Sequence, residues 1–425
     1  MTRLLSALKV LAAAVPLLAG SALADIAGVA PEQVGMSAER LDRITEITQG
    51  YVDDGKLAGV ITMVARHGKL VHFNAVGQRG AEDDRPLEKD ALFRIYSMTK
   101  PITAVAAMQL YEQGLFQLSD PISKFVPELA ELMVLNGDGE EEPARGPITM
   151  QQLLTHTAGF SYGFDPNDPV DQRYREARAL GAENLDDFAE LLGELPLKYH
   201  PGEQWHYSVA VDVTGIIVER LSGQRFDRYL AEHIFEPLGM NDTFFEVPED
   251  KWDRFLPNHR WDAKAGKLVT LGEASYGSYQ DVTLFSGGGG LVGTAMDYMR
   301  FAEMLRNGGS LDGARILSPR TVEFMTLNHL PASISSGGSG ETPGLGGRSL
   351  NGFGFGLGFG LVTDVPASGV MGSVGEYSWG GAAGTIFWVD PVEDFVVVAM
   401  IQLMGSPWPL RSELKVAVNQ AIVGD

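Results

Sequence analysis

Two kinds of hydrophobic pattern divide the chain, and the strand-like kind occurs near both of its ends. Val60–Ala65 and Leu70–Ala75 are β-rich runs that flank His67-Gly68, which predicts a hairpin. Residues 384–391 (GTIFWVDP) and 394–402 (DFVVVAMIQ) predict two more strands joined by a turn. Sheet structure is therefore expected from both ends of the chain.

Apolar side chains three or four positions apart predict helices in other parts of the chain. One helix begins after the capping residue Ser37, and another covers about residues 97–114. From there to about residue 280 few strand signals occur. The other expected helices are residues 150–160, 185–195, 213–223, 296–309 and 414–423. Glycine- and serine-rich residues 333–360 predict loops, with the Gly-Phe alternation at 352–360 entering a strand.

Strands at both ends with helices between them predict an α+β fold, in which an α/β part is joined to an all-α part. We expect residues 25–115 and 281–425 to build an α/β domain around one antiparallel sheet flanked by helices. Residues 116–280 are expected to form a mainly helical domain inserted into it. Catalytic groups are expected in the cleft between the two parts.

Composition and charge narrow the possible partners. The 425 residues are 44% hydrophobic and 21% charged, which is typical of a soluble globular enzyme. A formal net charge of -22 repels nucleic acid and anionic lipid, so we expect a small-molecule partner. The chain has no cysteine, which excludes disulfides, thiol nucleophiles, thiolate metal sites and a lipid-modified cysteine anchor.

The first 24 residues have the three parts of a secretory signal peptide. Arg3 and Lys9 supply positive charge, Leu11–Leu18 is a short apolar run, and Ala22-Leu23-Ala24 offers small residues for cleavage after Ala24. We therefore expect a periplasmic or secreted protein without a stable membrane anchor. The alternative is an uncleaved anchor or a buried first helix. The oligomeric state is left open.

The strongest candidate for chemistry is Ser97-Met98-Thr99-Lys100, because residues three apart on a helix lie on one face. A serine hydroxyl becomes a good nucleophile when a neighbouring base takes its proton. A lysine can be that base only if burial or nearby cations keep it neutral, and apolar neighbours such as Ile95 and Ile102 favour this. Taken alone, the S-x-x-K pattern is better explained by a helix-capping serine and a solvated lysine.

Several other segments make the pattern specific. FRIYSMTKPITA at 93–104 resembles the nucleophile helix of the serine β-lactamase and penicillin-binding-protein superfamily. Tyr207-Ser208-Val209 resembles the second motif of that superfamily, and Trp379-Gly380-Gly381 stands where the third motif lies. LLTHTAGF at 153–160 and SGGGGLVGTAMDYMRF at 286–301 are also similar to family sequence. The resemblance implies a β-lactamase/transpeptidase-like fold.

The resemblance also implies roles for individual residues. Ser97 attacks an acyl carbonyl, and Lys100, alone or with the Tyr207 phenolate, accepts its proton. Tyr207 returns a proton to the leaving group and later activates water. The backbone N–H groups of Ser97 and Ala382 form the oxyanion hole. Which of Lys100 and Tyr207 is the primary base stays open, because a phenolate at neutral pH requires a nearby cation.

Two departures from the β-lactamase pattern point to the substrate. Val209 replaces the usual asparagine and Trp379 the usual lysine, so the pocket formed with Gly380 and Gly381 is more apolar. Similar Tyr-Ser and Trp-Gly-Gly patterns occur in family VIII carboxylesterases, which implies a serine hydrolase acting on short-chain acyl esters. The alternatives are a periplasmic β-lactamase or D,D-peptidase, and a non-catalytic sensor that binds peptidoglycan or β-lactams.

A second serine also matches a hydrolase motif. Gly159-Phe160-Ser161-Tyr162-Gly163 fits G-x-S-x-G, but that motif requires a strand before the serine and a helix after it. Here a predicted helix precedes the serine and a loop follows it, so we expect Ser161 not to be the nucleophile. The eight histidines lack metal-ligand spacing and no dinucleotide-binding loop is present, so neither a metal nor a cofactor is expected.

Overall fold

The computed structural model describes most of the chain, namely residues 26–136, 139–272, 279–335 and 351–424. The predicted signal peptide lies outside the described residues, and so does most of the predicted loop that begins at residue 333. Both stay predictions. Among the described residues, no helix combines the length and the apolar character needed to cross a bilayer.

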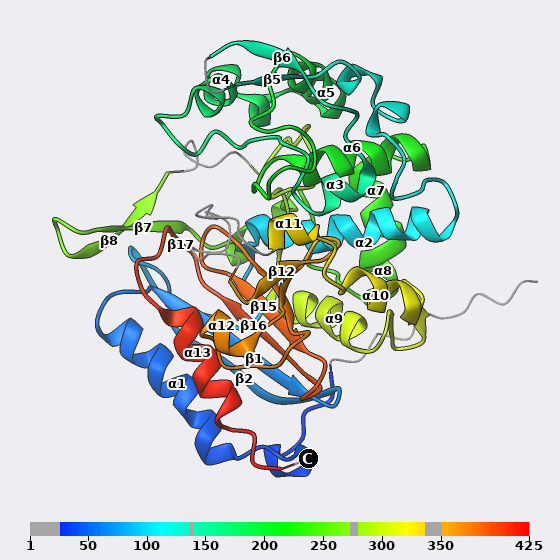
Figure 1. The fold of residues 1–425 in the computed structure, drawn as a ribbon. Coiled ribbons are helices and arrows are strands. Elements are labelled where there is room, and N and C mark those ends of the chain that lie inside the picture. The colour runs from blue at the N-terminus through cyan, green and yellow to red at the C-terminus, as the bar shows by residue number, and fades with distance from the viewer. Residues whose placement is uncertain (1–25, 137–138, 273–278, 336–350, 425) are drawn as a thin grey trace, which may run out of the picture.

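A central sheet joins the two ends of the chain (Figure 1). Its eight strands, in spatial order, are β12 (Phe353–Phe355), β13 (Gly360–Val362), β14 (Tyr377–Gly380), β15 (Ile386–Asp390), β16 (Phe395–Met400), β1 (Gly59–Arg66), β2 (Lys69–Gly80) and β3 (Asp83–Pro86). All neighbouring strands run antiparallel. In the β1–β16 pair, Ile61 lies opposite Met400 and Arg66 lies opposite Phe395. The predicted α+β fold, with an antiparallel sheet built from both ends, is confirmed.

The predicted hairpin turn at His67-Gly68 connects β1 and β2. Both residues adopt left-handed backbone angles, with φ values of 51° and 70°. A two-residue turn of this kind matches the twist of the flanking strands. Histidine rarely adopts positive φ, and here Asp394 holds it: the His67 Nδ1 atom lies 2.8 Å from a carboxylate oxygen of Asp394. The turn between β15 and β16 thus supports the turn between β1 and β2.

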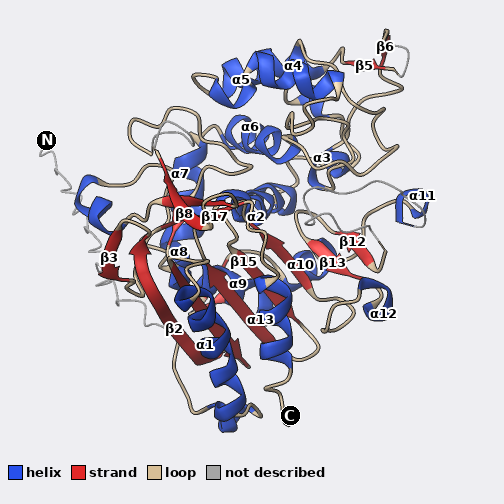
Figure 2. Cartoon of the chain, turned by 90° about the vertical axis from the view of Figure 1, so that its left-hand side faces the viewer, coloured by secondary structure: helices blue, strands red, loops and turns tan. Residues whose placement is uncertain are grey.

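Two helices from opposite ends of the sequence cover one face of the sheet (Figure 2). They are α1 (Ala38–Asp53) and α13 (Leu410–Asn419), and the Tyr51 hydroxyl donates a hydrogen bond of 2.8 Å to Glu413 between them. Ser37 caps α1 as predicted, because its hydroxyl accepts the Arg40 N–H. The last helix was predicted at 414–423 but ends at Asn419, because the following backbone instead bonds to residues 35–37.

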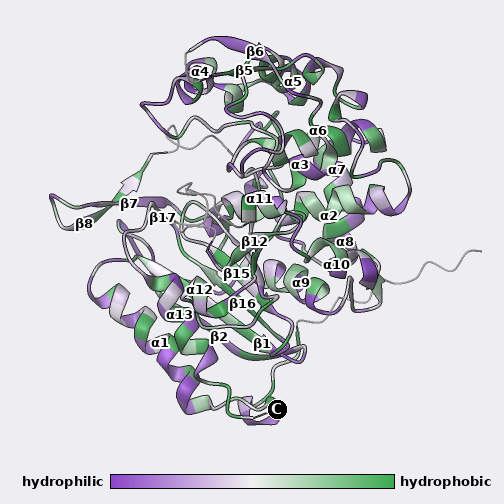
Figure 3. Cartoon of the chain, viewed as in Figure 1, coloured by the Kyte–Doolittle hydropathy of each residue, from purple (hydrophilic) through white to green (hydrophobic). Residues whose placement is uncertain are grey.

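The other face of the sheet is covered by helices buried on several sides. α9 (Ala295–Arg306) packs on β15 and β16, and α2 (Thr99–Glu112) lies between the sheet and a further helical layer (Figure 1). Figure 3 shows α2, β15 and β16 as mainly hydrophobic, whereas α1 carries hydrophilic residues on its outer side. α6 (Ala210–Ser222) packs against α2 from the helical layer and ends at Gly223, as predicted.

The region between residues 116 and 280 contains more strands than the sequence indicated. A short hairpin forms from β5 (Met133–Leu135) and β6 (Glu141–Pro143), and another from β7 (Asn258–Asp262) and β8 (Lys267–Leu271). β7 also pairs in parallel with β17 (Leu403–Met404). The β7 sequence NHRWD has no alternating pattern that would predict a strand. It forms one because it pairs with a segment more than 140 residues away along the chain. The boundaries predicted for the two domains stay a prediction.

The remaining elements are short and connect the larger ones. The helices are α3 (Met150–Leu154), α4 (Pro169–Ala177), α5 (Leu185–Gly193), α7 (Phe226–Leu230), α8 (Glu236–Leu238), α10 (Pro319–Met325), α11 (Ala332–Ser335) and α12 (Val365–Ser368). The strands are β4 (Phe93–Arg94), which pairs with β9 (Val292–Gly293), and β10 (Ser310–Leu311), which pairs with β11 (Ala314–Arg315).

The end of β14 is the point where the sheet comes closest to the start of α2. A Cβ atom at Gly381 would lie 2.5 Å from the Ile95 carbonyl oxygen and would collide with Thr385 Oγ1. We therefore predict that Gly381→Ala lowers the free energy of unfolding by about 2 kcal/mol, because the two segments must separate. Urea denaturation measures this change.

A matched control is Gly50→Ala in α1, where no atom lies within 4 Å of the added methyl group. Alanine is preferred to glycine inside a helix, so this variant is expected to gain about 0.5–1 kcal/mol. Equal stability of the two variants would contradict the tight packing of β14 on Ile95.

Candidate active site

The residues before α2 place Ser97 at the junction of the sheet and the helical layer. Ser97 lies in a single 3₁₀ turn, Tyr96–Met98, directly ahead of α2, and Lys100 lies in the first turn of α2. Tyr96 has a φ of 45°, an uncommon conformation for a residue that carries a Cβ. Such local strain is often found at functional sites, where surrounding packing maintains it. Ser97 is half-buried and Lys100 is buried.

The structure brings together the three side chains that the sequence singled out. The Ser97 Oγ atom lies 3.2 Å from Lys100 Nζ and 2.6 Å from the Tyr207 hydroxyl oxygen. Tyr207 comes from the loop before α6, which packs beside α2. The Lys100 amine also donates a hydrogen bond of 2.6 Å to the Gly288 carbonyl. One hydroxyl is thus held between an amine and a phenol, each able to exchange a proton with it.

Burial favours the uncharged form of both neighbours of Ser97. It lowers the pKa of Lys100 to about 7, while the Asp212 carboxylate acts in the opposite direction. Burial raises the pKa of Tyr207 above its ordinary value near 10, and the hydrogen bond with Ser97 offsets only part of this rise. Lys100 is therefore available as a neutral base where Tyr207 is still a protonated phenol. The geometry and the pKa values favour Lys100 as the primary base.

Asp212 is a component of the site that the sequence reading missed. It lies on α6, it is buried, and its carboxylate accepts hydrogen bonds from the Gly288 N–H at 2.9 Å and the Ser286 hydroxyl at 2.5 Å. The Tyr162 hydroxyl donates a third hydrogen bond at 3.0 Å. Asp212 thereby fixes the turn whose Gly288 carbonyl binds Lys100. The available signal was a single carboxylate in the otherwise apolar helix segment 209–218 (VAVDVTGIIV).

The glycines at 287 and 288 have a steric reason to be there. A Cβ atom at Gly287 would lie 2.9 Å from the Val211 carbonyl oxygen, and one at Gly288 would collide with the Asp212 carboxylate. The Thr103 hydroxyl donates a hydrogen bond of 2.7 Å to the Gly287 carbonyl, so α2 binds this turn as well. Residues with side chains at these positions would separate the turn from both helices and displace the acceptor of Lys100.

A cluster of aromatic rings excludes water from the same region. The His156 ring centroid lies 4.8 Å from that of Tyr207, and the Trp379 ring lies 5.5 Å from Tyr207. Burial, followed by repulsion from Lys100, holds the pKa of His156 well below its usual range. The Ser208 N–H donates to the His156 Nδ1 atom at 3.4 Å. His156 is therefore a neutral residue that orders the loop around it.

The predicted oxyanion hole and pocket residues lie around the end of β14. Ala382 follows Gly381, which packs on the carbonyl of Ile95 two residues before Ser97. The N–H groups of Ser97 and Ala382 donate no hydrogen bond to any other described residue, so both are available to a substrate oxygen.

Trp379 and Gly380 belong to β14, and Val209 stands at the start of α6, where it is buried. Gly380 leaves room for the Arg411 guanidinium, because a Cβ atom there would lie 2.9 Å from a guanidinium nitrogen. Gly381 leaves room for Ile95. The two glycines therefore serve close packing, while Trp379 and Val209 supply apolar surface near Tyr207.

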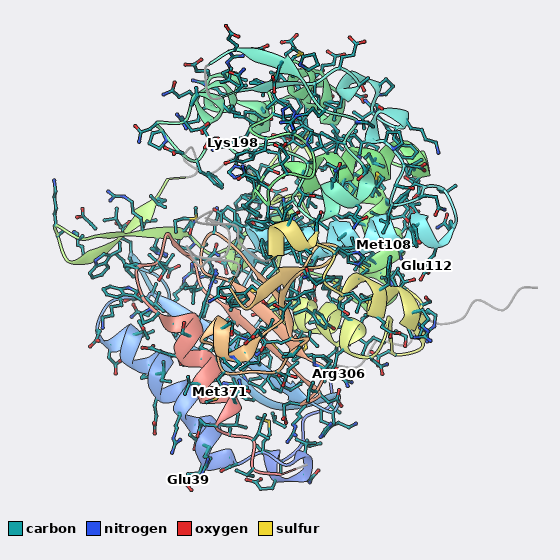
Figure 4. The ribbon with its side chains drawn as sticks, viewed as in Figure 1. Glu39, Met108, Glu112, Lys198, Arg306 and Met371 are labelled. Carbon is teal, nitrogen blue, oxygen red and sulfur yellow. The ribbon has the colours of Figure 1, made fainter. Side chains whose placement is uncertain are left out.

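The second candidate serine, Ser161, is part of a different network. It is buried, and its hydroxyl donates to the Asp171 carboxylate and accepts the Gly163 N–H at 3.0 Å. Lys198, labelled in the upper layer of Figure 4, lies 3.2 Å from the same carboxylate. No strand precedes Ser161, because it follows α3 through a loop. Its hydroxyl thus binds a carboxylate that stabilises the loop, in contrast to Ser97.

Comparison with known proteins agrees with this geometry. A sequence model of the Beta-lactamase family matches residues 44–421. The chain belongs to the beta-lactamase family. Protein Rv1367c of Mycobacterium tuberculosis is 36% identical over 358 residues, which are 82% of this chain and 87% of that protein. The lovastatin esterase of Penicillium rubens is 32% identical over 400 residues, or 89% of this chain and 96% of that protein.

A solved structure is also similar over nearly the whole chain. It is EstCE1, a hydrolase with promiscuous acyltransferase activity, with a TM-score of 0.74 and 25% sequence identity. The match covers 91% of this chain and 99% of EstCE1. The resemblance that the motifs indicated is therefore confirmed, and this family member is a hydrolase whose relatives include esterases.

Replacing each serine separately tests which one is the nucleophile. Ser97→Ala removes the hydroxyl between Lys100 and Tyr207, so we predict a loss of ester turnover of at least about a thousandfold. Ser161→Ala is expected to retain most of the activity and to lower stability by about 1–2 kcal/mol, because it leaves the buried Asp171 without a donor. Steady-state kinetics and urea denaturation check both. Activity retained in the first variant and lost in the second would reverse the assignment.

The pH profile tests the state of Lys100. Only the neutral amine accepts a proton, so kcat/KM is predicted to rise with pH through a pKa near 7. The charged or titratable groups around the amine are Asp212, Tyr162, Tyr207 and His156. Burial raises the pKa of both tyrosines and lowers that of the histidine, so Asp212 is the charged member of this group.

Asp212→Asn keeps an oxygen acceptor for the Gly288 N–H but removes the charge that favours the ammonium form. The acid limb of the profile is therefore expected to move to lower pH, by roughly half a unit to one unit. Ser286→Ala removes one hydrogen bond to Asp212 without changing its charge, so its acid limb is expected to stay in place. A shift of the Asp212→Asn limb to higher pH would contradict this electrostatic role.

Proposed function

We propose that this protein is a carboxylesterase that cleaves short-chain acyl esters through an acyl-enzyme on Ser97. The observation that carries the proposal is the position of the Ser97 hydroxyl, 3.2 Å from the Lys100 amine and 2.6 Å from the Tyr207 phenol. A protein that only binds a ligand has no need of this proton-exchanging arrangement. The complete set of groups therefore argues against a non-catalytic sensor.

Acylation begins when the neutral Lys100 amine takes the Ser97 proton and Oγ attacks the ester carbonyl. The N–H groups of Ser97 and Ala382 then stabilise the oxyanion. As the C–O bond of the ester breaks, Tyr207 donates its proton to the leaving alcohol oxygen. The products of this step are the acyl-Ser97 ester, a Lys100 ammonium and a Tyr207 phenolate.

Deacylation returns every proton to its starting place. The Tyr207 phenolate takes a proton from water, whose oxygen attacks the acyl carbonyl. When the second tetrahedral intermediate collapses, Ser97 leaves the acyl carbon and receives the proton held by Lys100. The ammonium and the phenolate stabilise each other between the two steps, because Lys100 Nζ lies 4.5 Å from the centre of the Tyr207 ring.

The surroundings of the site favour esters over β-lactams. Trp379 and Val209 stand where β-lactamases usually carry a lysine and an asparagine, and both are buried apolar surface near Tyr207. A simple acyl chain gains from such surface, whereas a β-lactam loses polar contacts to its carboxylate and amide. The lovastatin esterase and EstCE1, both named for ester or acyl chemistry, support the same choice.

A direct comparison of two chromogenic substrates tests this preference. We predict that kcat/KM for p-nitrophenyl butyrate exceeds that for nitrocefin by at least about a hundredfold, since only nitrocefin carries a carboxylate and an amide, which the apolar Trp379 and Val209 cannot bind. The Ser97→Ala variant supplies the background for both assays. Turnover of nitrocefin above that of the ester would instead support the β-lactamase alternative.

A further inference from the structure

A cavity of about 260 Å³ lies behind Tyr162, on the side of the helical layer where α4 ends. Its lining comes from the end of α4, from the 3₁₀ turn Ala179–Gly181 and from the start of α6. The lining side chains that matter for binding are Tyr162, Arg175, Arg178, Leu180 and Val209.

The cavity shares a wall with the candidate active site. The Tyr162 ring centre lies 5.1 Å from Lys100 Nζ and 5.3 Å from the ring centre of Tyr207. Val209, the other shared residue, comes two positions after Tyr207 and begins α6. A substrate bound at Ser97 therefore has this cavity as its neighbour on the Tyr162 side.

The cavity carries two positive charges that the protein itself does not neutralise. Arg175 donates to main-chain carbonyls of Gly163 and Asp165, at 2.6 and 2.9 Å, and forms no ion pair with any residue in the described ranges. Arg178 is exposed and likewise has no carboxylate partner there. The carboxylate of Asp171 is bound by Ser161 and Lys198 instead.

These two free cations contrast with the charge of the whole chain, which is -22. A chain so rich in carboxylates repels anions over most of its surface, so an unneutralised arginine pair attracts them to one place. Arg178 also has a φ of 50° at the end of α4, a conformation that most residues avoid. The backbone therefore turns at Arg178, and the Arg178 side chain lines the cavity.

Exposed apolar side chains occur in the lining of the cavity, at Leu180, and beside it, at Phe164. Phe164 is 62% exposed and stacks on Tyr162 with ring centres 5.1 Å apart, and Leu180 is 48% exposed. Large apolar side chains at the surface next to a cavity are typical of ligand sites. The combination of apolar side chains and arginines fits a molecule with an apolar body and an anionic end.

We propose that this cavity binds the carboxylate of an amphipathic ester, with Arg178 as the residue that recognises the anion and Phe164 and Leu180 as contacts for its apolar body. The inference rests on the esterase function proposed above and specifies its substrate class: esters that carry a free carboxylate on the acyl or the alcohol part. Arg175 holds the loop and adds positive charge beside Arg178.

Two matched pairs of substrates test the proposal on the full-length protein. Mono-p-nitrophenyl adipate and p-nitrophenyl hexanoate differ by a carboxylate at the end of the acyl chain. The butyrate esters of 4-hydroxybenzoate and 4-hydroxybenzamide differ by a carboxylate on the alcohol. For each pair the quantity of interest is the ratio of kcat/KM, anionic over neutral, after subtraction of the spontaneous rate.

Arg178→Gln is expected to lower this ratio about tenfold in at least one pair, because a charge-assisted hydrogen bond to the carboxylate is lost. The pair that responds identifies the part of the ester that enters the cavity. The matched control is Arg173→Gln, on the same helix, where the native guanidinium already pairs with Glu141. Its ratios are expected to stay within twofold of wild type. In the wild-type protein, raising the ionic strength is expected to reduce the ratio in the responding pair.

Three results would overturn the proposal. One is an unchanged ratio in both pairs for Arg178→Gln, and another is an equal fall for Arg173→Gln, which would indicate only a general effect of charge. In both cases the proposed esterase function would still be supported if the protein turns over the neutral esters and the Ser97→Ala variant does not. The third is the absence of Ser97-dependent turnover for every ester, which would remove the esterase function and this inference together.

Discussion

A buried amine whose pKa is lowered towards neutrality is the constraint on which the rest of the site depends. Lys100 is almost completely buried, and its amine contacts the Ser97 hydroxyl and the Gly288 carbonyl. Desolvation disfavours the charged form of a lysine, and this lowers its pKa towards neutrality. The site must therefore exclude enough water to lower the pKa of the amine, and it must offer enough polar partners to hold the amine in place. The contact with one carbonyl and one hydroxyl meets both conditions.

The fold supplies that environment by joining distant parts of the chain. α2 packs against α6, and the 3₁₀ turn Tyr96–Met98 directly ahead of it contacts β14, so elements from both layers surround Lys100. The pairing of β16 with β1 joins the two parts of the sheet and brings β14 and Gly381 against Ile95. The proposed oxyanion donors, base and proton donor thus come from three separate segments. Each segment is fixed by packing that also contributes to stability.

Local patterns in the sequence were sufficient for many of the elements and for the catalytic candidates. The capping of α1 by Ser37, the turn at His67-Gly68 and the end of α6 at Gly223 are local features, and the structure confirms them. Ser97, Lys100 and Tyr207 were found because a serine one helical turn before a lysine matches a known motif. The second serine motif lacks the preceding strand that it requires, since Ser161 follows a loop and binds Asp171.

The features that the sequence did not reveal depend on contacts between remote residues. Asp212 acts on Lys100 through the backbone of Gly288, which lies 76 positions from Asp212 along the chain. The pairing of β7 with β17 and the early end of α13 likewise depend on segments from the opposite end of the chain. The sequence also could not reveal the two arginines of the cavity, Arg175 and Arg178. That they lack a carboxylate partner among the described residues is a property of the folded chain.

Burial acts on the pKa values of Lys100 and Tyr207 in opposite directions, and this supports the order of proton transfers in the proposed mechanism. Burial favours the neutral form of both groups, since it lowers the pKa of the amine and raises that of the phenol. Once Lys100 has taken the Ser97 proton, an ammonium stands 4.5 Å from the centre of the Tyr207 ring. That new charge favours the phenolate, so the phenol becomes more acidic at the step in which it must protonate the leaving group. The first transfer therefore prepares the second, and neither group requires a permanent charge.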